Sequence, residues 1–227
     1  MSSNPYWSVL RRFVLLWRKL AKLRYPAKPW HPPRPAKNVA APSEGIDPQV
    51  ASDIRLVVLD VDGVLTDGGI YVGARPGQAP IEFKRFDIQD GLAVKMLRWA
   101  GIDVAIVSGR VSEATAHRAE ELGIDECHQD PGANKLPIVK GLLDDRGLGW
   151  EQAAMVGDDL ADLPVLERVG LPVAVANAVP EVQEVSRWST QASGGRGAVR
   201  EFVRALLIAR GEWDGLVREY CDARSEE

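Results

Sequence analysis

Two carboxylates separated by one residue follow the most strand-like apolar segment of the chain. The apolar run 56–59 leads directly into Asp60 and Asp62, and Gly63 comes next. A continuous run of Leu and Val of this length is typical of a buried strand in a parallel sheet. The glycine predicts a bend that directs the Asp62 side chain and backbone carbonyl toward one point. Alone, the pattern also fits a strand followed by a polar turn, so the other strand ends decide its meaning.

Residues of complementary chemistry stand after two further apolar runs. They are Ser108 and Gly109 after the run 104–107, Asp158 and Asp159 after the run 153–156, then Asp162, with Lys135 between the two runs. If the three strands are neighbours, these groups converge on the crevice at the carboxyl edge of the sheet. Several carboxylates in one crevice need a cation, and hard oxygen ligands favour Mg²⁺. A lysine and a hydroxyl at a helix start bind phosphoryl oxygens. An aspartate can attack phosphorus to form an aspartyl-phosphate, so the residues predict Mg²⁺-dependent phosphoryl transfer.

The elements that position these residues alternate between strands and helices. Strands are predicted at 56–59, 104–107, 153–156 and 173–175, and helices at 89–100, 112–122, 134–145, 161–169, 181–185 and 198–210. Right-handed βαβ crossovers then give an α/β fold with a doubly wound, Rossmann-like parallel sheet. The segments 69–73 and 81–86 predict a β-hairpin that projects from the catalytic edge. Gly101 and Gly123 predict helix ends.

Composition divides the chain into four parts. Residues 1–25 predict a basic amphipathic helix, 26–51 a Pro-rich linker, 52–212 the catalytic domain and 213–227 a C-terminal tail. A basic helix rich in Trp and Leu could lie on an anionic membrane surface or dock on a partner. It could equally be an appendage packed within an oligomer, or non-native sequence from a misplaced start codon. No apolar run near the N-terminus is long enough to span a bilayer, and we expect no signal peptide.

Charge and cysteine usage narrow the class of protein. The 227 residues carry a net charge of −4, but residues 1–40 hold nine Lys/Arg and no acid, which leaves a net charge of −13 on the remainder. A body this acidic argues against nucleic-acid binding. Cys127 and Cys221 have no paired spacing, which argues against a disulfide framework or a zinc site and for a reducing, cytoplasmic compartment. His117 and His128 have no evident carboxylate partner and are expected to be structural or surface residues.

The order of the motifs resembles that of the haloacid dehalogenase-like phosphatases. The matching residues are Asp60-Val61-Asp62, Ser108, Lys135 and Gly157-Asp158-Asp159-Leu160-Ala161-Asp162. Each motif is short, but all four occur in order on the expected elements, which makes chance assembly improbable. The resemblance implies this superfamily's fold and its aspartyl-phosphate chemistry.

A closer resemblance connects residues 55–212 with the 3-deoxy-D-manno-octulosonate 8-phosphate phosphatases. It is carried by DVDGVLTDG (60–68), FDIQDGLAVKML (86–97), SGR (108–110), NKL (134–136), GDDLADLPVL (157–166) and GGRGAVRE (194–201). The family has no cap domain and forms tetramers in which the hairpin and the C-terminal tail help to close a neighbouring site. The resemblance therefore implies a role in lipopolysaccharide biosynthesis, a sugar acid phosphate as substrate and a homotetramer with shared sites.

The resemblance also implies a role for individual residues. Asp60 would be nucleophile and Mg²⁺ ligand, Asp62 general acid and base with its carbonyl on the metal, and Asp158 the remaining ligand. Ser108, Gly109 and Lys135 would hold the phosphoryl group, while Asp159 and Asp162 would orient metal-bound water and Lys135 from behind. Candidates for binding the substrate's carboxylate or phosphate are Lys84, Arg85, Arg110 and Arg196, each of which could equally be a solvent-exposed surface charge.

Three departures from the family pattern leave the sugar open. Ser108 replaces a common Thr, Gln89 stands where an Arg is frequent, and the segment 129–133 is longer and more acidic than usual. Gln89 and this segment motivate an alternative, a phosphatase for a related nonulosonate (acylneuraminate-type) 9-phosphate. A second alternative is a non-catalytic interaction module, against which the intact acidic and lysine motifs argue. A mutase is disfavoured because transfer without hydrolysis needs a cap to exclude water.

Overall fold

The computed structural model describes residues 45–74 and 76–225, and the predicted basic helix at 1–25 lies outside this part of the chain. Its centre is a six-stranded parallel sheet in the order β5-β4-β1-β6-β7-β8. The strands are β1 (Leu56–Leu59), β4 (Asp103–Ser108), β5 (Cys127–Gln129), β6 (Ala153–Gly157), β7 (Leu171–Ala174) and β8 (Trp188–Ser189). The predicted α/β fold with a doubly wound parallel sheet is confirmed.

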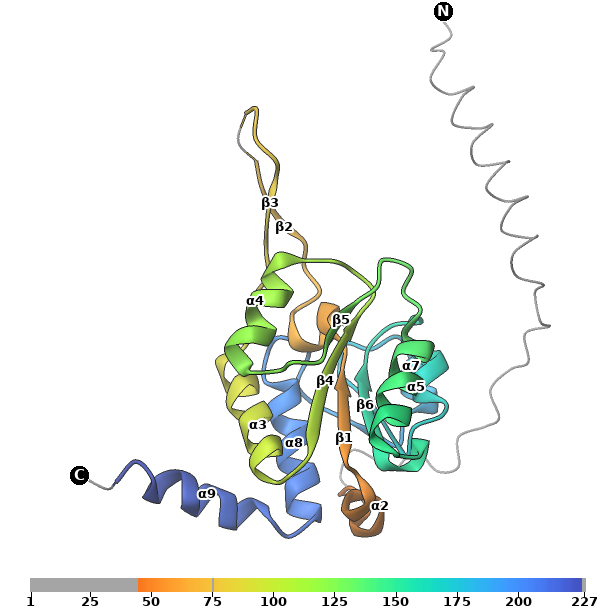
Figure 1. Ribbon diagram of the computed structural model, residues 1–227, viewed down its shortest axis with the longest axis vertical. Helices are drawn as coiled ribbons and strands as arrows, with labels where there is room; N and C mark the ends of the chain where they lie inside the picture. Colours follow the sequence, from red (N-terminus) through yellow and green to blue (C-terminus); the bar gives the residue numbers. More distant parts are fainter. Residues whose placement is uncertain (1–44, 75, 226–227) are drawn as a thin grey trace, which may run out of the picture. The chain divides into compact units, whose positions relative to one another are not determined.

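Helices cover both faces of this sheet (Figure 1). One layer holds α3 (Ile88–Trp99), α4 (Glu113–Leu122) and α8 (Ala198–Ala209), and the other holds α5 (Lys135–Arg146), α6 (Leu163–Leu166) and α7 (Pro180–Val185). The two layers bury β1 completely, since its four residues are 0% exposed. Val58 lies in register with Ala105 of β4 and with Met155 of β6, which fixes the central strands relative to one another.

Short-range signals account for several helix ends. Asp87 accepts a hydrogen bond from the Gln89 N–H (2.9 Å) and so caps α3, and its carboxylate suits the positive end of the helix dipole. Gly123 ends α4 at φ 68°, as the sequence predicts, and Gly147 ends α5 at φ 63°. This left-handed backbone is accessible to glycine without the steric cost that a Cβ brings.

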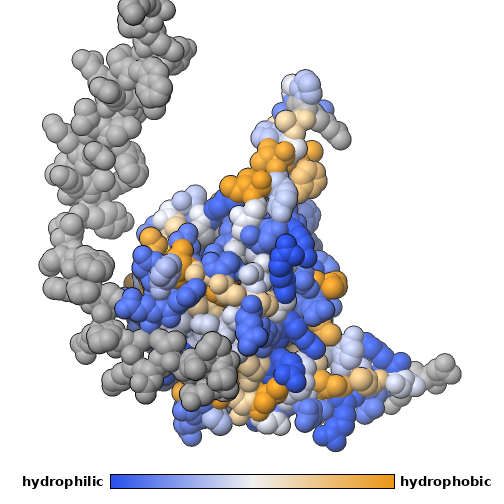
Figure 2. All heavy atoms as spheres, turned by 180° about the vertical axis from the view of Figure 1, so that it is seen from behind, coloured by the Kyte–Doolittle hydropathy of each residue, from blue (hydrophilic) through white to orange (hydrophobic). Residues whose placement is uncertain are grey.

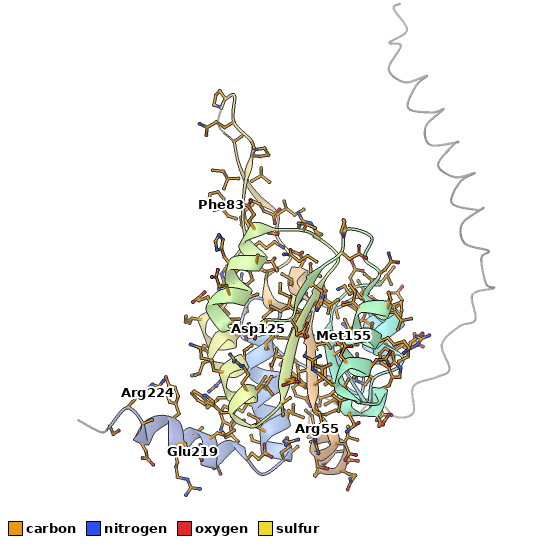
Figure 3. All side chains as sticks on the ribbon, in the orientation of Figure 1. Arg55, Phe83, Asp125, Met155, Glu219 and Arg224 are labelled. Atoms are coloured by element: carbon orange, nitrogen blue, oxygen red, sulfur yellow. The ribbon has the colours of Figure 1, made fainter. Side chains whose placement is uncertain are left out.

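The hairpin leaves the body of the domain at the carboxyl edge of the sheet (Figure 1). It consists of β2 (Tyr71–Gly73) paired antiparallel with β3 (Ile81–Phe83), both shorter than predicted. Apolar side chains gather on it, and Figure 2 shows them as a patch that stands clear of the body. Phe83 is 57% exposed there, whereas Met155 of β6 is fully buried in the sheet (Figure 3).

Two strands and two α-helices have no counterpart in the predictions. Strands β5 and β8 and helices α2 (Pro48–Asp53) and α9 (Trp213–Asp222) were not anticipated. The helix α2 begins within the predicted linker and crosses its boundary at 51, and Ala51 and the preceding Ile46 belong to the buried core. The helix α9 lies in the predicted tail, and it packs through Trp213 and Leu216. None of the helices in the described ranges has the length and apolarity needed to cross a bilayer.

Candidate active site

The three predicted strand ends meet at one edge of the sheet. Asp60 directly follows β1, Ser108 is the last residue of β4, and Asp158 directly follows β6. Because β4 and β6 flank β1 on either side, parallel pairing brings these ends together. Lys135, the first residue of α5, reaches into the same crevice. Its Nζ donates to Asp60 Oδ1 at 2.5 Å and to Asp162 Oδ1 at 2.6 Å.

The loop after β1 turns at Gly63. Asp60 is still extended, whereas Gly63, with φ 99°, kinks the turn Val61–Leu65 at its centre. A Cβ at this glycine would lie 2.0 Å from Asp158 Oδ2. Glycine is therefore required twice here, for the backbone conformation and for the close approach of the Asp158 carboxylate.

Three carboxylates form the candidate metal centre. Oxygens of Asp60, Asp158 and Asp162 lie within 4.8 Å of one another, and Asp60 is 5% exposed. Burial, together with the charge of Asp162, raises the pKa of Asp60 to about 6. Burial also raises the pKa of Asp158 to about 8, with the charge of Asp60 as the next cause. The cluster therefore carries more negative charge than Lys135 alone balances.

The donor set fits a divalent cation with a preference for oxygen ligands. Asp158 Oδ1 and Asp62 Oδ2 are buried and have no hydrogen-bond partner in the described chain. Buried carboxylate oxygens without a partner are costly, and a metal ion within the cluster would satisfy that of Asp158. Carboxylates and a backbone carbonyl are the ligands that Mg²⁺ prefers, whereas no thiol or imidazole belongs to this cluster.

Asp162 and Asp159 occupy different positions. Asp162 is fully buried; besides Lys135, it accepts hydrogen bonds from the N–H groups of Asp158 (3.0 Å) and Asp159 (3.4 Å). It therefore orients both the lysine and the loop that carries Asp158. Asp159 is exposed at the rim and accepts from the Leu160 N–H at 2.7 Å, so its side chain makes no contact with Lys135.

Lys135 and Ser108 provide the polar groups for a phosphoryl ligand. Burial favours the neutral form of Lys135, but the charges of Asp60 and Asp162 outweigh it and raise the pKa, so the ammonium stays protonated. Ser108 is 1% exposed, and its Oγ accepts a hydrogen bond from the Arg110 N–H at 3.2 Å. Gly109 lies against Ala133, where a Cβ would come within 3.0 Å of the alanine side chain.

The four candidate substrate-binding residues fall into two pairs. Lys84 Nζ donates to Asp62 Oδ1 at 2.6 Å, and Arg110 Nη1 lies 3.7 Å from the same oxygen. Arg85 is exposed and donates to the Gly195 carbonyl. Arg196 is also exposed and belongs to the same glycine-rich segment, residues 194–197. The structure thus brings Lys84 and Arg110 to the Asp62 carboxylate, whereas Arg85 contacts the backbone of the segment that carries Arg196.

Further site residues were missed by the sequence analysis. Asn177 donates to the Gly63 carbonyl (2.9 Å) and accepts from the Gly194 N–H (2.7 Å), which links the loop after β1 to the glycine-rich segment. Gly194 packs so closely that a Cβ would meet the Gly63 carbonyl. The pair Gly194-Gly195 was a signal for this close approach, whereas a single asparagine 114 residues after Gly63 carried none.

Another site residue that the sequence analysis missed is Glu82, on β3. It pairs with Arg110, with 3.1 Å between Oε2 and Nη2.

One expectation about histidine is wrong. His128 lies on β5 with its Nε2 2.8 Å from Glu126 Oε2, so it does have a carboxylate partner. Glu126 directly precedes β5 and His128 is its middle residue, so the pairing depends on a strand that the sequence analysis did not predict. His117 is exposed on α4, 3.9 Å from Glu120.

Comparison with known proteins agrees with this geometry. Residues 128–202 match the family model of haloacid dehalogenase-like hydrolases. The chain is 44% identical over 164 residues to the 3-deoxy-D-manno-octulosonate 8-phosphate phosphatase of Escherichia coli K12. The aligned residues cover 72% of this chain and 85% of that relative. A haloacid dehalogenase superfamily (subfamily III A) hydrolase from Legionella pneumophila has a similar structure, with TM-score 0.71 and 39% identity over 77% of this chain and 93% of that one.

A second solved structure contains ligands. It is a 3-deoxy-D-manno-octulosonate 8-phosphate phosphatase from Moraxella catarrhalis in complex with magnesium ion, phosphate ion and KDO. Its TM-score is 0.70 and its identity 36%, covering 76% of this chain and 97% of that chain.

Proposed function

The chain belongs to the 3-deoxy-D-manno-octulosonate 8-phosphate phosphatase family of haloacid dehalogenase-like hydrolases, and from this premise we propose its reaction. It hydrolyses the phosphomonoester of a sugar acid, 3-deoxy-D-manno-octulosonate 8-phosphate, with Mg²⁺ and through an aspartyl-phosphate. The observation that carries the proposal is the position of Lys135, which joins Asp60 to Asp162 within the carboxylate cluster. A nucleophile, a phosphate-binding cation and an oxygen-rich metal centre then share one crevice.

The first half of the reaction forms the covalent intermediate. A carboxylate oxygen of Asp60 attacks phosphorus, the bond from phosphorus to the sugar oxygen breaks, and Asp62 donates a proton to that leaving oxygen. Lys135 and Ser108 hold the phosphoryl oxygens and neutralise the charge that develops on them.

The second half releases phosphate. Asp62, now a carboxylate, takes a proton from water, the water oxygen attacks phosphorus, and the bond to Asp60 breaks. Asp60, the Asp62 carbonyl and Asp158 would hold Mg²⁺, which supplies charge neutralisation to the transferring group when bound. Asp162 acts behind these residues, where it holds Lys135 and the Asp158 loop in place, and Asp159 would orient metal-bound water from the exposed rim.

Cations around the crevice suit the sugar acid. Lys84 and Arg110 stand beside Asp62, and Arg85 and Arg196 stand on the hairpin base and the glycine-rich segment. Guanidinium and ammonium groups bind carboxylates through charge-assisted hydrogen bonds. The alternative substrate is a nonulosonate 9-phosphate, and Gln89 motivates it because this exposed residue offers no cation.

Assembly and location complete the proposal. We infer a cytoplasmic homotetramer with sites shared between subunits, in which the exposed apolar hairpin contacts a neighbouring copy. We propose the domain boundaries given by the sequence analysis. We also propose that residues 1–25 contact the membrane surface. Native mass measurement tests the tetramer, and liposome binding with and without residues 1–44 tests the membrane contact.

The test of function is Mg²⁺-dependent phosphate release from a panel of phosphomonoesters. We expect the octulosonate 8-phosphate to have the highest kcat/KM and chelation of Mg²⁺ to abolish turnover. Equal or faster hydrolysis of the nine-carbon acid phosphate would favour the alternative substrate. A chain that is inert toward the whole panel would instead be a non-catalytic interaction module.

A further inference from the structure

A ring of four charges stands at the sugar side of the site. Lys84 Nζ lies 2.6 Å from Asp62 Oδ1 and 3.7 Å from Glu82 Oε1. Arg110 bridges the same two carboxylates, with Nη2 3.1 Å from Glu82 Oε2 and Nη1 3.7 Å from Asp62 Oδ1. Three separate segments supply the ring: the loop after β1, the hairpin and the loop after β4.

Glu82 leaves one oxygen of this ring without a hydrogen bond. Its Oε1 is buried and has no hydrogen-bond partner in the described chain, because Lys84 at 3.7 Å is too distant to donate. Glu82 does not belong to the carboxylates that lie within 4.8 Å of one another, so the metal centre does not explain this oxygen. Buried carboxylate oxygens without a partner are uncommon in folded proteins and call for an explanation.

The cations of the ring also retain free donors. The Lys84 ammonium has three N–H groups, and within the described ranges its hydrogen bonds number one, to Asp62. The Arg110 side chain is 41% exposed, and within the described ranges its guanidinium makes one hydrogen bond, from Nη2 to Glu82. The ring therefore combines free donors with one free acceptor.

Such a combination matches a hydroxy acid better than a plain phosphate ester. A carboxylate takes hydrogen bonds from the two cations, and a hydroxyl of the same molecule donates to a carboxylate oxygen. We propose that Glu82 is a specificity-determining residue, which accepts a hydrogen bond from a sugar hydroxyl while it holds Lys84 and Arg110 for the substrate carboxylate. This inference rests on the proposed function and extends it to the part of the substrate that does not react.

Charge balance gives Glu82 its positioning effect. Without Glu82, Lys84 and Arg110 would share the single carboxylate of Asp62. Arg110 Nη1, now 3.7 Å from Asp62 Oδ1, would then be free to bind that oxygen directly. With Glu82 present, Arg110 is bound on the opposite side and kept available. A substrate that carries neither a carboxylate nor hydroxyls gains nothing from this arrangement.

The test compares two substrates in one preparation. Glu82→Gln keeps the size of the side chain but removes its charge and one acceptor, and Glu184→Gln is the matched change at an exposed position of α7. The measured quantity is kcat/KM for the sugar acid phosphate divided by kcat/KM for p-nitrophenyl phosphate. Misfolded protein lowers both terms equally, so the ratio reports recognition alone.

We expect Glu82→Gln to lower this ratio about 10- to 100-fold, chiefly through KM, because hydrogen bonds to charged groups have about this effect. Glu184→Gln should keep the wild-type ratio. If the ratio for Glu82→Gln stays within about 3-fold of the wild-type ratio, the inference is overturned. A change that small is no larger than the loss of a single neutral hydrogen bond would cause. A wild type that hydrolyses p-nitrophenyl phosphate but no sugar acid phosphate contradicts the proposed function as well, so the two failures are distinguishable.

Discussion

The two ends of the site come from different parts of the fold. At the phosphate end, Asp60, Lys135 and Asp162 are at most 5% exposed, and they lie at the end of β1, at the start of α5 and directly before α6. At the sugar end, Lys84 and Glu82 belong to the hairpin, and Arg110 is 41% exposed. The sheet fixes the first group through backbone pairing, whereas few core contacts constrain the second.

This difference separates reaction from recognition. Groups that bind the transferring phosphoryl require fixed positions, because preorganised charge supplies most of the rate. Groups that recognise the rest of the substrate can stand on a short hairpin, where substitutions leave the core undisturbed. If the interpretation is correct, changes at the phosphate end abolish turnover, and changes at the sugar end alter selectivity.

The largest effect is expected for Asp60→Asn. An amide cannot form the phosphoryl-enzyme, and loss of a covalent nucleophile costs on the order of 10⁶-fold in other enzymes. We expect phosphate release to fall at least about 10⁴-fold at an unchanged circular dichroism spectrum. If the variant instead retains measurable turnover above a few per cent, Asp60 is not the nucleophile and the phosphate end is wrongly assigned.

The next effect is expected for Lys135→Met. Removal of one preorganised donor to a developing charge costs about 10²- to 10³-fold in kcat. The variant also leaves Asp60 and Asp162 buried against each other, so its melting temperature should fall.

The control for this prediction is Lys140→Met on the same helix. Its ammonium is 60% exposed and pairs with Asp144, and an exposed pair contributes little. Equal losses in the two variants would contradict the proposed role of Lys135 and point to a general effect of removing charge from α5.

The sequence predicted the phosphate end because the signals there are local. The apolar runs 56–59 and 153–156 stop where the acidic residues start, and parallel strands bring their ends to one edge. The helix bounds carry local signals too, as at Gly123. Asp60, Lys135 and Asp158 were therefore placed together before any contact was known.

The sugar end was harder to predict because no local pattern shows where the hairpin places its side chains. Lys84 reaches Asp62 across 22 residues, and Asn177 reaches Gly63 across 114. A glutamate such as Glu82 is indistinguishable in sequence from a surface charge. The missed strands β5 and β8 are similarly two or three residues long and half-buried, so neither shows an apolar run or a clear alternation.

A smaller effect is expected for Lys84→Met, which tests the sugar end directly. The ammonium is 1% exposed and donates to Asp62, so we expect a fall in kcat/KM of about 10-fold, consistent with one charge-assisted hydrogen bond. The fall should be greater for the sugar acid phosphate than for p-nitrophenyl phosphate. Lys95→Met, at an exposed position of α3, is the control. Loss of about 10³-fold or more on both substrates would place Lys84 with the reaction chemistry and erase the distinction between the two ends.

The last prediction concerns stability rather than activity and rests on Asp90, which connects α3 to the start of α8. The carboxylate is 1% exposed; Oδ1 accepts from the Arg200 N–H at 2.7 Å, and Oδ2 is buried without a hydrogen-bond partner in the described residues. Burial raises the pKa of Asp90 from 3.8 to about 6. The folded state therefore holds a proton that the unfolded state has already released between these two pH values.

It follows that Asp90 makes the fold less stable as the pH rises from about 4 to 6, by at most about 3 kcal/mol for a shift of this size.

Asp90→Asn keeps the acceptor for Arg200 and removes the ionisation, so the free energy of unfolding of the variant should exceed that of wild type above pH 6 and approach it near pH 4. Urea denaturation across this range measures the difference, and Asp145→Asn, at an exposed position of α5, is the control. If the free energies of unfolding of wild type and Asp90→Asn change in parallel with pH, ionisation of this buried carboxylate does not destabilise the fold, and the prediction is wrong.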